Sequence, residues 1–277
     1  MSNAEILIEA TQVEKEFRRG GTRVRAVRDV SFQLRAGESL AIVGESGSGK
    51  STVARMVMGM TEPTSGTISL AGGSVPSAGR STKSRRARAA FVQMVFQDPY
   101  SSLDPRQRIS DCLMEALSMH TELDRPAREA RVRQLLDQVS LDPSLAASYP
   151  RALSGGQRQR VAIARALATD PRVLVLDEAV SALDVSVQAR ILRLLESIRT
   201  ERGMSYIFIS HDLGVVREIS DTILVMKHGE VVESGATATV LDDPQHPYTR
   251  LLRACVPGPG WQPADALVAI EGYRGAL

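Results

Sequence analysis

Three features that would each point to a particular class of protein are scarce or missing in this sequence. Its two cysteines, Cys112 and Cys255, are far apart, so we expect no disulfide framework and no cysteine metal site, which suits a reducing compartment. No run of residues approaches 18 consecutive apolar positions, and the first residues lack the basic and apolar segments of a secretory signal. We therefore expect any work at a membrane to be done from one side.

An excess of charge of one sign is also missing. The 34 basic residues nearly balance the 32 acidic ones, so nothing in the net charge favours nucleic acid as a partner. Residues 71–88 are locally basic, which indicates either a solvated surface or contact with a partner or lipid headgroups. A hydrophobic content of 43% in 277 residues is enough for a substantial core, in one large domain or in a domain with a subdomain.

The most informative stretch is a glycine-rich loop between an apolar run, 40–43, and a helix-like segment, 53–58. It fits the phosphate-binding pattern G-x-x-x-x-G-K-[ST]. Its backbone N–H groups would converge on phosphate oxygens, Lys50 would add a charge near the β and γ phosphates, and the Ser51 hydroxyl would ligate Mg²⁺. The alternative is a chance match in a Gly/Ser-rich turn. The loop consists of Gly44, Glu45, Ser46, Gly47, Ser48, Gly49, Lys50, Ser51 and Thr52.

Hydrophobic periodicity predicts an α/β fold with a mainly parallel sheet. A β-rich layer comes first, residues 98–153 have helical character, and the second half alternates strands with helices. Within 98–153, Asp124 is a candidate helix cap followed by Pro126. Predicted strands lie at 6–9, 30–34, 67–70, 91–96, 173–176, 206–209, 223–226 and 231–232, and predicted helices at 158–168, 187–202 and 213–219.

Two carboxylates, Asp177 and Glu178, follow the buried strand predicted at 173–176. Strands of a parallel sheet deliver such residues to its carboxyl edge, where the phosphate loop also starts. Asp177 would bind the metal and Glu178 would orient the attacking water. The alternative is an ordinary strand end that meets a solvated turn.

A second possible anion site opens the helix predicted at 158–168. Ser154 would cap this helix, and Gly155 and Gly156 leave backbone N–H groups exposed at its positive end, followed by Gln157. Because one nucleotide has no use for both anion sites, we infer that this one serves a nucleotide held by another subunit. A plain Ser-Gly-Gly helix start is the alternative.

These motifs, with Gln97, His211 and the segment Ser181–Asp184, stand in the order and spacing of the ATP-binding cassette (ABC) family, which the chain resembles over about residues 5–240. The resemblance implies that two cassettes dock head to tail around ATP and Mg²⁺. It implies that Gln97 senses Mg²⁺, that His211 contacts the γ-phosphate and that Asp184 lies at the dimer interface. It also implies that Phe17 stacks on adenine. Without the resemblance, Phe17 indicates a core aromatic and His211 an ordinary strand-end histidine.

The family also implies an organisation into domains. Residues 1–97 and 154–243 would form a P-loop NTPase core of the RecA-like kind with an N-terminal antiparallel β layer. Residues 98–153 would be an inserted helical subdomain, and 244–277 a partly irregular C-terminal extension.

Residues 96–106 and 246–252 resemble the branch of the family that imports oligopeptides, dipeptides and nickel. Ala179 departs from the proline that the family usually has after its catalytic pair; a similar alanine occurs in nickel-type members and favours metal cargo slightly. Cys255 stands alone where some peptide importers have a cysteine cluster, so we expect no iron–sulfur cluster.

The resulting expectation is an ATP-hydrolysing subunit bound peripherally to the cytoplasmic face of the inner membrane. Its partners would be a second ATPase, with a related chain favoured over an identical one, two permease subunits and, indirectly, an extracellular binding protein, with no nucleic acid. A soluble cassette ATPase acting on DNA or ribosomes is one alternative, although such proteins usually have paired cassettes or long insertions. An exporter ATPase is the other.

Overall fold

The computed structural model describes residues 4–19, 21–75, 81–97, 103–256 and 273. The chain divides into two compact units. The first comprises the described parts of Met1–Ile8, Arg35–Gly37 and Ser69–Tyr206, and the second comprises those of Glu9–Leu34, Glu38–Ile68 and Ile207–Leu277. The domain boundaries expected at 97, 153 and 243 stay predictions.

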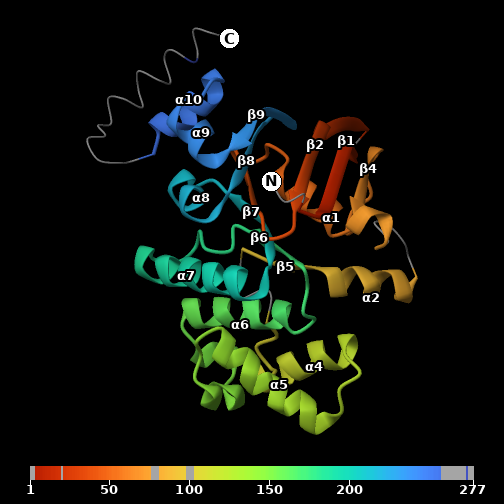
Figure 1. Cartoon of the computed structure of the whole chain (residues 1–277), viewed down its shortest axis with the longest axis vertical. Coiled ribbons are helices and arrows are strands. Elements are labelled where there is room, and N and C mark those ends of the chain that lie inside the picture. Colours follow the sequence, from red (N-terminus) through yellow and green to blue (C-terminus); the bar gives the residue numbers. More distant parts are fainter. Residues whose placement is uncertain (1–3, 20, 76–80, 98–102, 257–272, 274–277) are drawn as a thin grey trace. The chain divides into compact units, whose positions relative to one another are not determined.

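A three-stranded sheet in the order β2-β1-β4 contains most of the N-terminal β layer (Figure 1). Its strands are β1 (Ile6–Arg19), β2 (Thr22–Arg35) and β4 (Ser65–Leu70). Only two residues link β1 to β2, and such a short link permits antiparallel pairing only. β2 begins well before the predicted strand at 30–34. Its first four residues are exposed, so no apolar alternation in the sequence marks this part of the strand.

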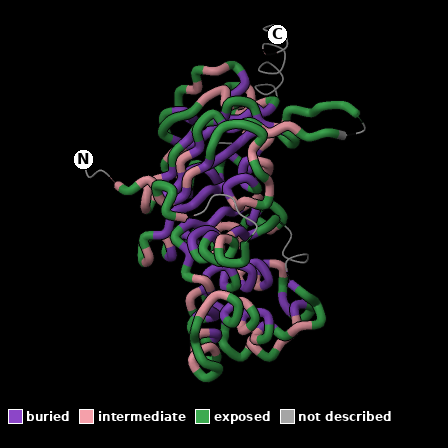
Figure 2. Tube along the Cα trace, turned by 90° about the vertical axis from the view of Figure 1, so that its right-hand side faces the viewer, coloured by how far each residue is buried: buried purple, intermediate pink, exposed green. Residues whose placement is uncertain are grey.

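The second unit also contains the strand that leads into the phosphate loop. All five residues of β3 (Ser39–Val43) are buried, and β3 runs parallel to β8 (Thr222–Lys227), with Val43 opposite Val225. β8 pairs antiparallel with β9 (Glu230–Ala236), with a bulge between Val225 and Met226. Burial on every side explains the uninterrupted apolar run of β3. Figure 2 shows that buried residues follow one another in continuous stretches of the chain.

Four helices complete the described part of the second unit. α1 (Lys50–Val57) follows the loop, and α8 (Leu213–Ile219) packs against β3 and has the bounds that the sequence predicted. α9 (Thr237–Asp242) and α10 (Pro247–Ala254) were not predicted. Both are short, so their periodicity is hard to see in the sequence. Residues 257–272 and 274–277 of the partly irregular extension expected at 244–277 fall outside the described residues.

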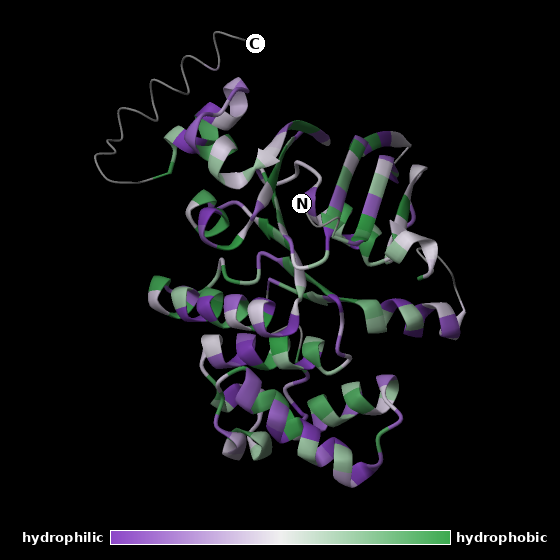
Figure 3. Ribbon diagram, viewed as in Figure 1, coloured by the Kyte–Doolittle hydropathy of each residue, from purple (hydrophilic) through white to green (hydrophobic). Residues whose placement is uncertain are grey.

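In the first unit, β5 (Val92–Val95) runs parallel to β6 (Val173–Asp177). α6 (Gly155–Leu167) packs on β5 and on α7 (Val185–Arg202), which ends at Gly203 with φ 62°. Both helices show hydrophobic and hydrophilic residues in turn, as expected for helices with one buried face (Figure 3). β7 (Ser205–Ser210) is entirely buried and passes from the first unit into the second.

Short elements in the first unit fill the remaining connections. η1 (Ala71–Gly73) and α2 (Thr82–Phe91) precede β5. In α2 the charged residues Lys83, Arg85 and Arg86 are exposed, which fits both interpretations of the basic stretch, whereas Arg88 is buried.

The described part of 98–153 is helical, as predicted. α4 (Ile109–His120) and α5 (Arg125–Gln138) pack on each other and on α6, followed by η2 (Pro143–Ala147) and η3 (Pro150–Ala152) (Figure 1). The predicted cap is confirmed, because the Asp124 carboxylate accepts a hydrogen bond from the backbone N–H of Ala127 at 2.9 Å. The apolar residues spaced along one side of this segment, Val132, Leu135, Leu136 and Val139, are all buried.

The cap of α5 predicts a measurable stability loss. Replacing Asp124→Ala leaves N–H groups of the first turn unpaired, so we expect the free energy of unfolding to fall by about 1 kcal/mol. Urea unfolding followed by circular dichroism measures this change. The control is Glu129→Ala on the same helix, which removes only the exposed ion pair with Arg125 and is expected to change it by less than about 0.5 kcal/mol. Equal losses for the two variants would contradict the role of the cap.

Candidate functional site

The phosphate loop of the second unit joins the buried strand β3 to α1. Its tip residues, Glu45, Ser46 and Gly47, are exposed, whereas Gly44, Ser48 and Lys50 are buried. The carbonyl of Gly49 accepts hydrogen bonds from the N–H groups of Thr52 and Val53, both at 3.0 Å, which begins the helix. The predicted sequence of strand, loop and helix is therefore confirmed.

Two glycines of the loop occupy places that no other residue could fill. Gly44 has φ 144°, and a Cβ atom there would lie 2.1 Å from the carbonyl oxygen of Met226. Gly49 has φ 107°, and its Cβ would lie 2.4 Å from the carbonyl oxygen of Ala26. Close approach and positive φ together require glycine at both positions. At these two positions the loop backbone thus lies against its neighbours with no side chain between them. The resulting backbone cradle fits the phosphates of a nucleotide.

Lys50 lies inside this cradle. Its side chain is buried at 5% exposure, and its Nζ donates to the carbonyls of Gly44 at 2.7 Å and Glu45 at 2.8 Å. The ammonium group is therefore held by neutral carbonyls at the mouth of the loop. A phosphate oxygen would be a stronger, charge-assisted acceptor for it.

Two other predicted residues of the second unit are at the surface. Phe17 on β1 is 42% exposed, with Lys15 Nζ 5.2 Å from its ring centroid, so the core interpretation of this aromatic is wrong. Its exposed face is available for stacking. His211 follows β7 directly and is exposed, one residue before Asp212, which caps α8.

In the first unit, Gln97 and Glu178 form a direct contact. Glu178 follows Asp177 at the end of β6, and its Oε2 accepts a hydrogen bond from Gln97 Nε2 at 2.9 Å. Ser181 closes the turn, because its Oγ donates to the carbonyl of Glu178 at 2.9 Å. A carboxylate accepts only from the amide nitrogen, so the carbonyl oxygen of Gln97 is not used in this bond.

The backbone at Glu178 is unusual. Its φ of 48° lies in the left-handed region, which costs a non-glycine residue about 1 kcal/mol or more. Several other described non-glycine residues, among them Gln12 and Asp29, have a similar φ. The next residue, Ala179, is buried and allows a wider range of φ than the proline expected from the family.

The glycine motif at the start of α6 forms the capped helix end that the sequence predicted. Ser154 accepts a hydrogen bond from the N–H of Gln157 at 3.3 Å, and the Gln157 side chain accepts from the N–H of Ser154 at 2.9 Å, a capping box. Gly156 has a packing role as well, since a Cβ there would lie 2.4 Å from a methyl group of Val187. Gly155 has a looser environment, where a Cβ would lie 3.6 Å from Leu183.

Asp184 caps α7 and has an exposed apolar neighbour. Its Oδ1 accepts from Ser186 Oγ at 2.8 Å and from the Val187 N–H at 3.0 Å, and these bonds lower the pKa of the carboxyl group. Val185, the first residue of the helix, is 82% exposed. A valine left in solvent at a rigid helix start suits a surface that another chain covers.

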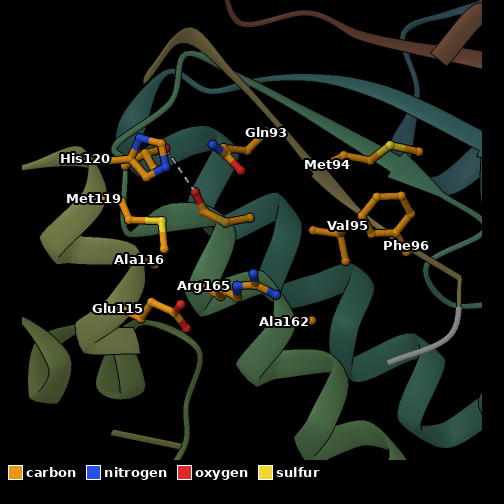
Figure 4. Close-up of a pocket in the computed structure, with 12 residues that line it drawn as sticks. Gln93, Met94, Val95, Phe96, Glu115, Ala116, Met119, His120, Ala162 and Arg165 are labelled. Carbon is orange, nitrogen blue, oxygen red and sulfur yellow. Dashed lines mark hydrogen bonds between the residues drawn. The ribbon is translucent and has the colours of Figure 1, made fainter. Parts of the chain in front are cut away.

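The first unit also contains a cavity of about 540 Å³ between β5, α4 and α6 (Figure 4). Phe96, the residue before Gln97, lines it from the strand side. Met119 and His120 line it from α4, and Arg165 from α6. Sequence reasoning did not predict this cavity, because it arises where three separate elements meet.

Two further features are missing from the part of the chain that the structure describes. No helix in the described part of the chain is long and apolar enough to span a membrane. Within the same residues, no group of three or more His, Cys, Asp or Glu is arranged to hold a metal ion.

Comparison with known proteins gives close relatives. The di/tripeptide transport ATP-binding protein DppF of Pseudomonas aeruginosa is 46% identical over 94% of this chain and 80% of its own length. The glutathione import ATP-binding protein GsiA of Salmonella typhimurium is 48% identical over 87% of this chain but only 38% of its own length.

Solved structures agree with these relatives. The cassette MJ0796, a dimer in a post-hydrolysis state with ADP and Pi bound, has a TM-score of 0.74 and 28% identity over 83% of this chain and 99% of its own. CbiO1 of Clostridium perfringens, part of the transporter complex cbiONQ, has a TM-score of 0.77 and 28% identity over 90% and 96%. A family model described as ABC transporter matches residues 27–181. Because this model covers more than half of the sequence and DppF matches nearly all of it, the chain belongs to the ABC transporter family.

Proposed function

We propose that this chain is the ATP-hydrolysing subunit of an ABC importer and that its cargo is short peptides. The hydrolytic part of the proposal is carried by one observation, the Glu178 carboxylate held by the amide of Gln97 at 2.9 Å. The cargo is inferred from the relatives, whose names refer to di- and tripeptides and to glutathione, itself a tripeptide. Nickel, the other cargo expected from the branch, has no support among these relatives.

The chain would hold ATP at both ends of the nucleotide, the phosphates and the adenine base. The loop from Gly44 to Thr52 would surround the β and γ phosphates with backbone N–H groups, and Lys50 would exchange its carbonyl partners for phosphate oxygens. The exposed ring of Phe17 would stack on the adenine. Stacking tolerates any base, so this contact contributes affinity more than selectivity.

Hydrolysis would depend on Glu178. Its carboxylate would accept a hydrogen bond from water and orient it in line with the γ-phosphate, and Gln97 would fix the carboxylate for that task. His211 would contact the γ-phosphate. Ser51, Gln97 and Asp177 offer the oxygen ligands that suit Mg²⁺, which neutralises charge developing on the phosphates.

A second ATPase chain would complete each nucleotide site. The capped helix start at Ser154–Gln157 would face the nucleotide of the partner, and Asp184 with the exposed Val185 would lie at the interface. This arrangement explains why the chain has a second candidate anion site, a rigid helix end with two glycines, in addition to the phosphate loop. We favour a related chain over an identical one as the partner, as in the importer branch.

The helical segment 98–153 would transmit the ATP-driven closure of the ATPase dimer to two permease subunits at the cytoplasmic face of the inner membrane. The cavity supports this proposal, because Phe96 lines it and Gln97 follows directly, so a partner seated there would reach the residue that holds Glu178. An extracellular binding protein would deliver the cargo. The balanced net charge gives no support to the DNA- or ribosome-acting alternative.

Glu178→Gln should separate binding from hydrolysis. The amide keeps the shape of the side chain but no longer orients water as a carboxylate does, so we expect ATP turnover to fall at least about a hundredfold. ATP should still bind and should produce dimers that persist. Phosphate release and light scattering after size exclusion measure the two effects. Glu196→Gln, on the exposed side of α7, is the control; wild-type turnover in Glu178→Gln would remove this residue from its proposed role.

Lys50→Ala should weaken ATP binding. Losing a charge-assisted hydrogen bond to phosphate is expected to raise the dissociation constant at least about tenfold. Isothermal titration of nucleotide measures it, with Lys83→Ala on α2 as the control for a loss of positive charge. Unaltered affinity in Lys50→Ala would count against the assignment of the loop.

Phe17→Ala should weaken ATP binding through the base alone. We expect the dissociation constant of ATP to rise roughly fivefold or more, as typical base stacking implies. Phe17→Trp should retain the affinity. Tripolyphosphate, which has no base, should bind all three proteins equally, and an equal loss for tripolyphosphate would indicate a damaged loop rather than a lost stack.

A further inference from the structure

The segment 246–252, which resembles the importer branch of the family, has no role in the function proposed above. In the second unit it begins α10, and its start is fixed to β9. The Glu233 carboxylate accepts hydrogen bonds from the backbone N–H groups of Gln245 at 2.8 Å and His246 at 3.0 Å. His246 Nδ1 then accepts from the N–H of Tyr248 at 3.1 Å and caps the helix. The position of Tyr248 is therefore set by the sheet.

Tyr248 is fully buried, and its hydroxyl oxygen accepts a hydrogen bond from the backbone N–H of Glu45 at 2.9 Å. Burial raises the pKa of this tyrosine, so the hydroxyl stays neutral. Its ring also has the Lys227 ammonium 5.0 Å from its centroid. Lys227 follows Met226, whose carbonyl lies against Gly44. The beginning of the phosphate loop is thus bordered by the end of β8 and by α10.

The bond from Glu45 has a specific geometric consequence. The N–H of Glu45 and the carbonyl of Gly44 belong to one peptide group, and in a trans peptide they point in opposite directions. Lys50 Nζ donates to that carbonyl at 2.7 Å, while Tyr248 accepts from the N–H on the opposite edge. One peptide plane is therefore held from both sides, and the bond to Tyr248 does not involve the Lys50 ammonium.

We propose that Tyr248 is a positioning residue for ATP binding, which holds the Gly44–Glu45 peptide in the orientation that presents Lys50 and the following N–H groups to phosphate. This inference rests on the proposed ATPase function. The Glu45 N–H is committed to the tyrosine, so the anion cradle begins at the residues after it. The helix α10 thereby becomes part of the nucleotide-binding machinery without touching the nucleotide.

Tyr248→Phe in the full chain tests the proposal. It keeps the ring and its contact with Lys227 but leaves the Glu45 N–H unpaired. We expect the dissociation constant and KM for ATP to rise about three- to tenfold, the effect of one lost hydrogen bond, while kcat changes less than twofold. Amide exchange of Glu45, followed by NMR of selectively labelled protein, should become at least about tenfold faster.

Tyr206→Phe is the matched control. Tyr206 is also fully buried, and its hydroxyl donates to the carbonyl of Leu195 on α7, within the first unit, at 2.6 Å. It should lower the melting temperature without changing ATP affinity or Glu45 exchange. If Tyr248→Phe also lowers only the melting temperature, Tyr248 has a merely structural role and the proposal is overturned.

The wild-type protein offers a second test that does not depend on a variant. In the nucleotide-free chain, the Glu45 amide should exchange much more slowly than the amide of Gly47 at the exposed tip of the loop. Equal rates would overturn the proposal. A wild-type chain that binds no ATP would instead overturn the proposed function, so the two failures are distinguishable.

Discussion

The close approach of Gly44 to the carbonyl of Met226 is the constraint on which the candidate site depends. With 2.1 Å available to a Cβ atom, the loop can leave β3 at this point only without a side chain. That single contact fixes how the loop turns, and the turn places Lys50 within reach of the Gly44 and Glu45 carbonyls. The pairing of β3 with β8 therefore sets the position of the Lys50 charge, the direction of the loop backbone and the start of α1.

Local rules allowed much of the site to be predicted from the sequence. Short segments of sequence are enough to predict the phosphate loop, the Asp124 cap and the capping box at Ser154. Each of these features depends on residues within a few positions of one another. The buried strands β3 and β6 were found because both are uninterrupted apolar runs that end at turn residues. Their order along the chain indicated the fold class.

Contacts between distant segments could not be predicted in this way. The bond between Gln97 and Glu178 joins residues 81 positions apart, and no local pattern marks it. The cavity beside Phe96 and the true lengths of β1 and β2 likewise depend on tertiary packing. Phe17 was expected in the core from its type alone, yet it is 42% exposed, and only the family resemblance had indicated a surface role for it.

The hydrogen bond between Glu45 and Tyr248 spans 203 residues of sequence. A nonsense mutation or gene fusion that removed the chain from residue 244 onward would spare every recognised cassette motif, and a motif search would still score the product as intact. Its phosphate loop would nevertheless have lost a neighbour. In genome comparisons, a truncated cassette should therefore be checked for the equivalent of α10 before it is counted as a functional transporter ATPase.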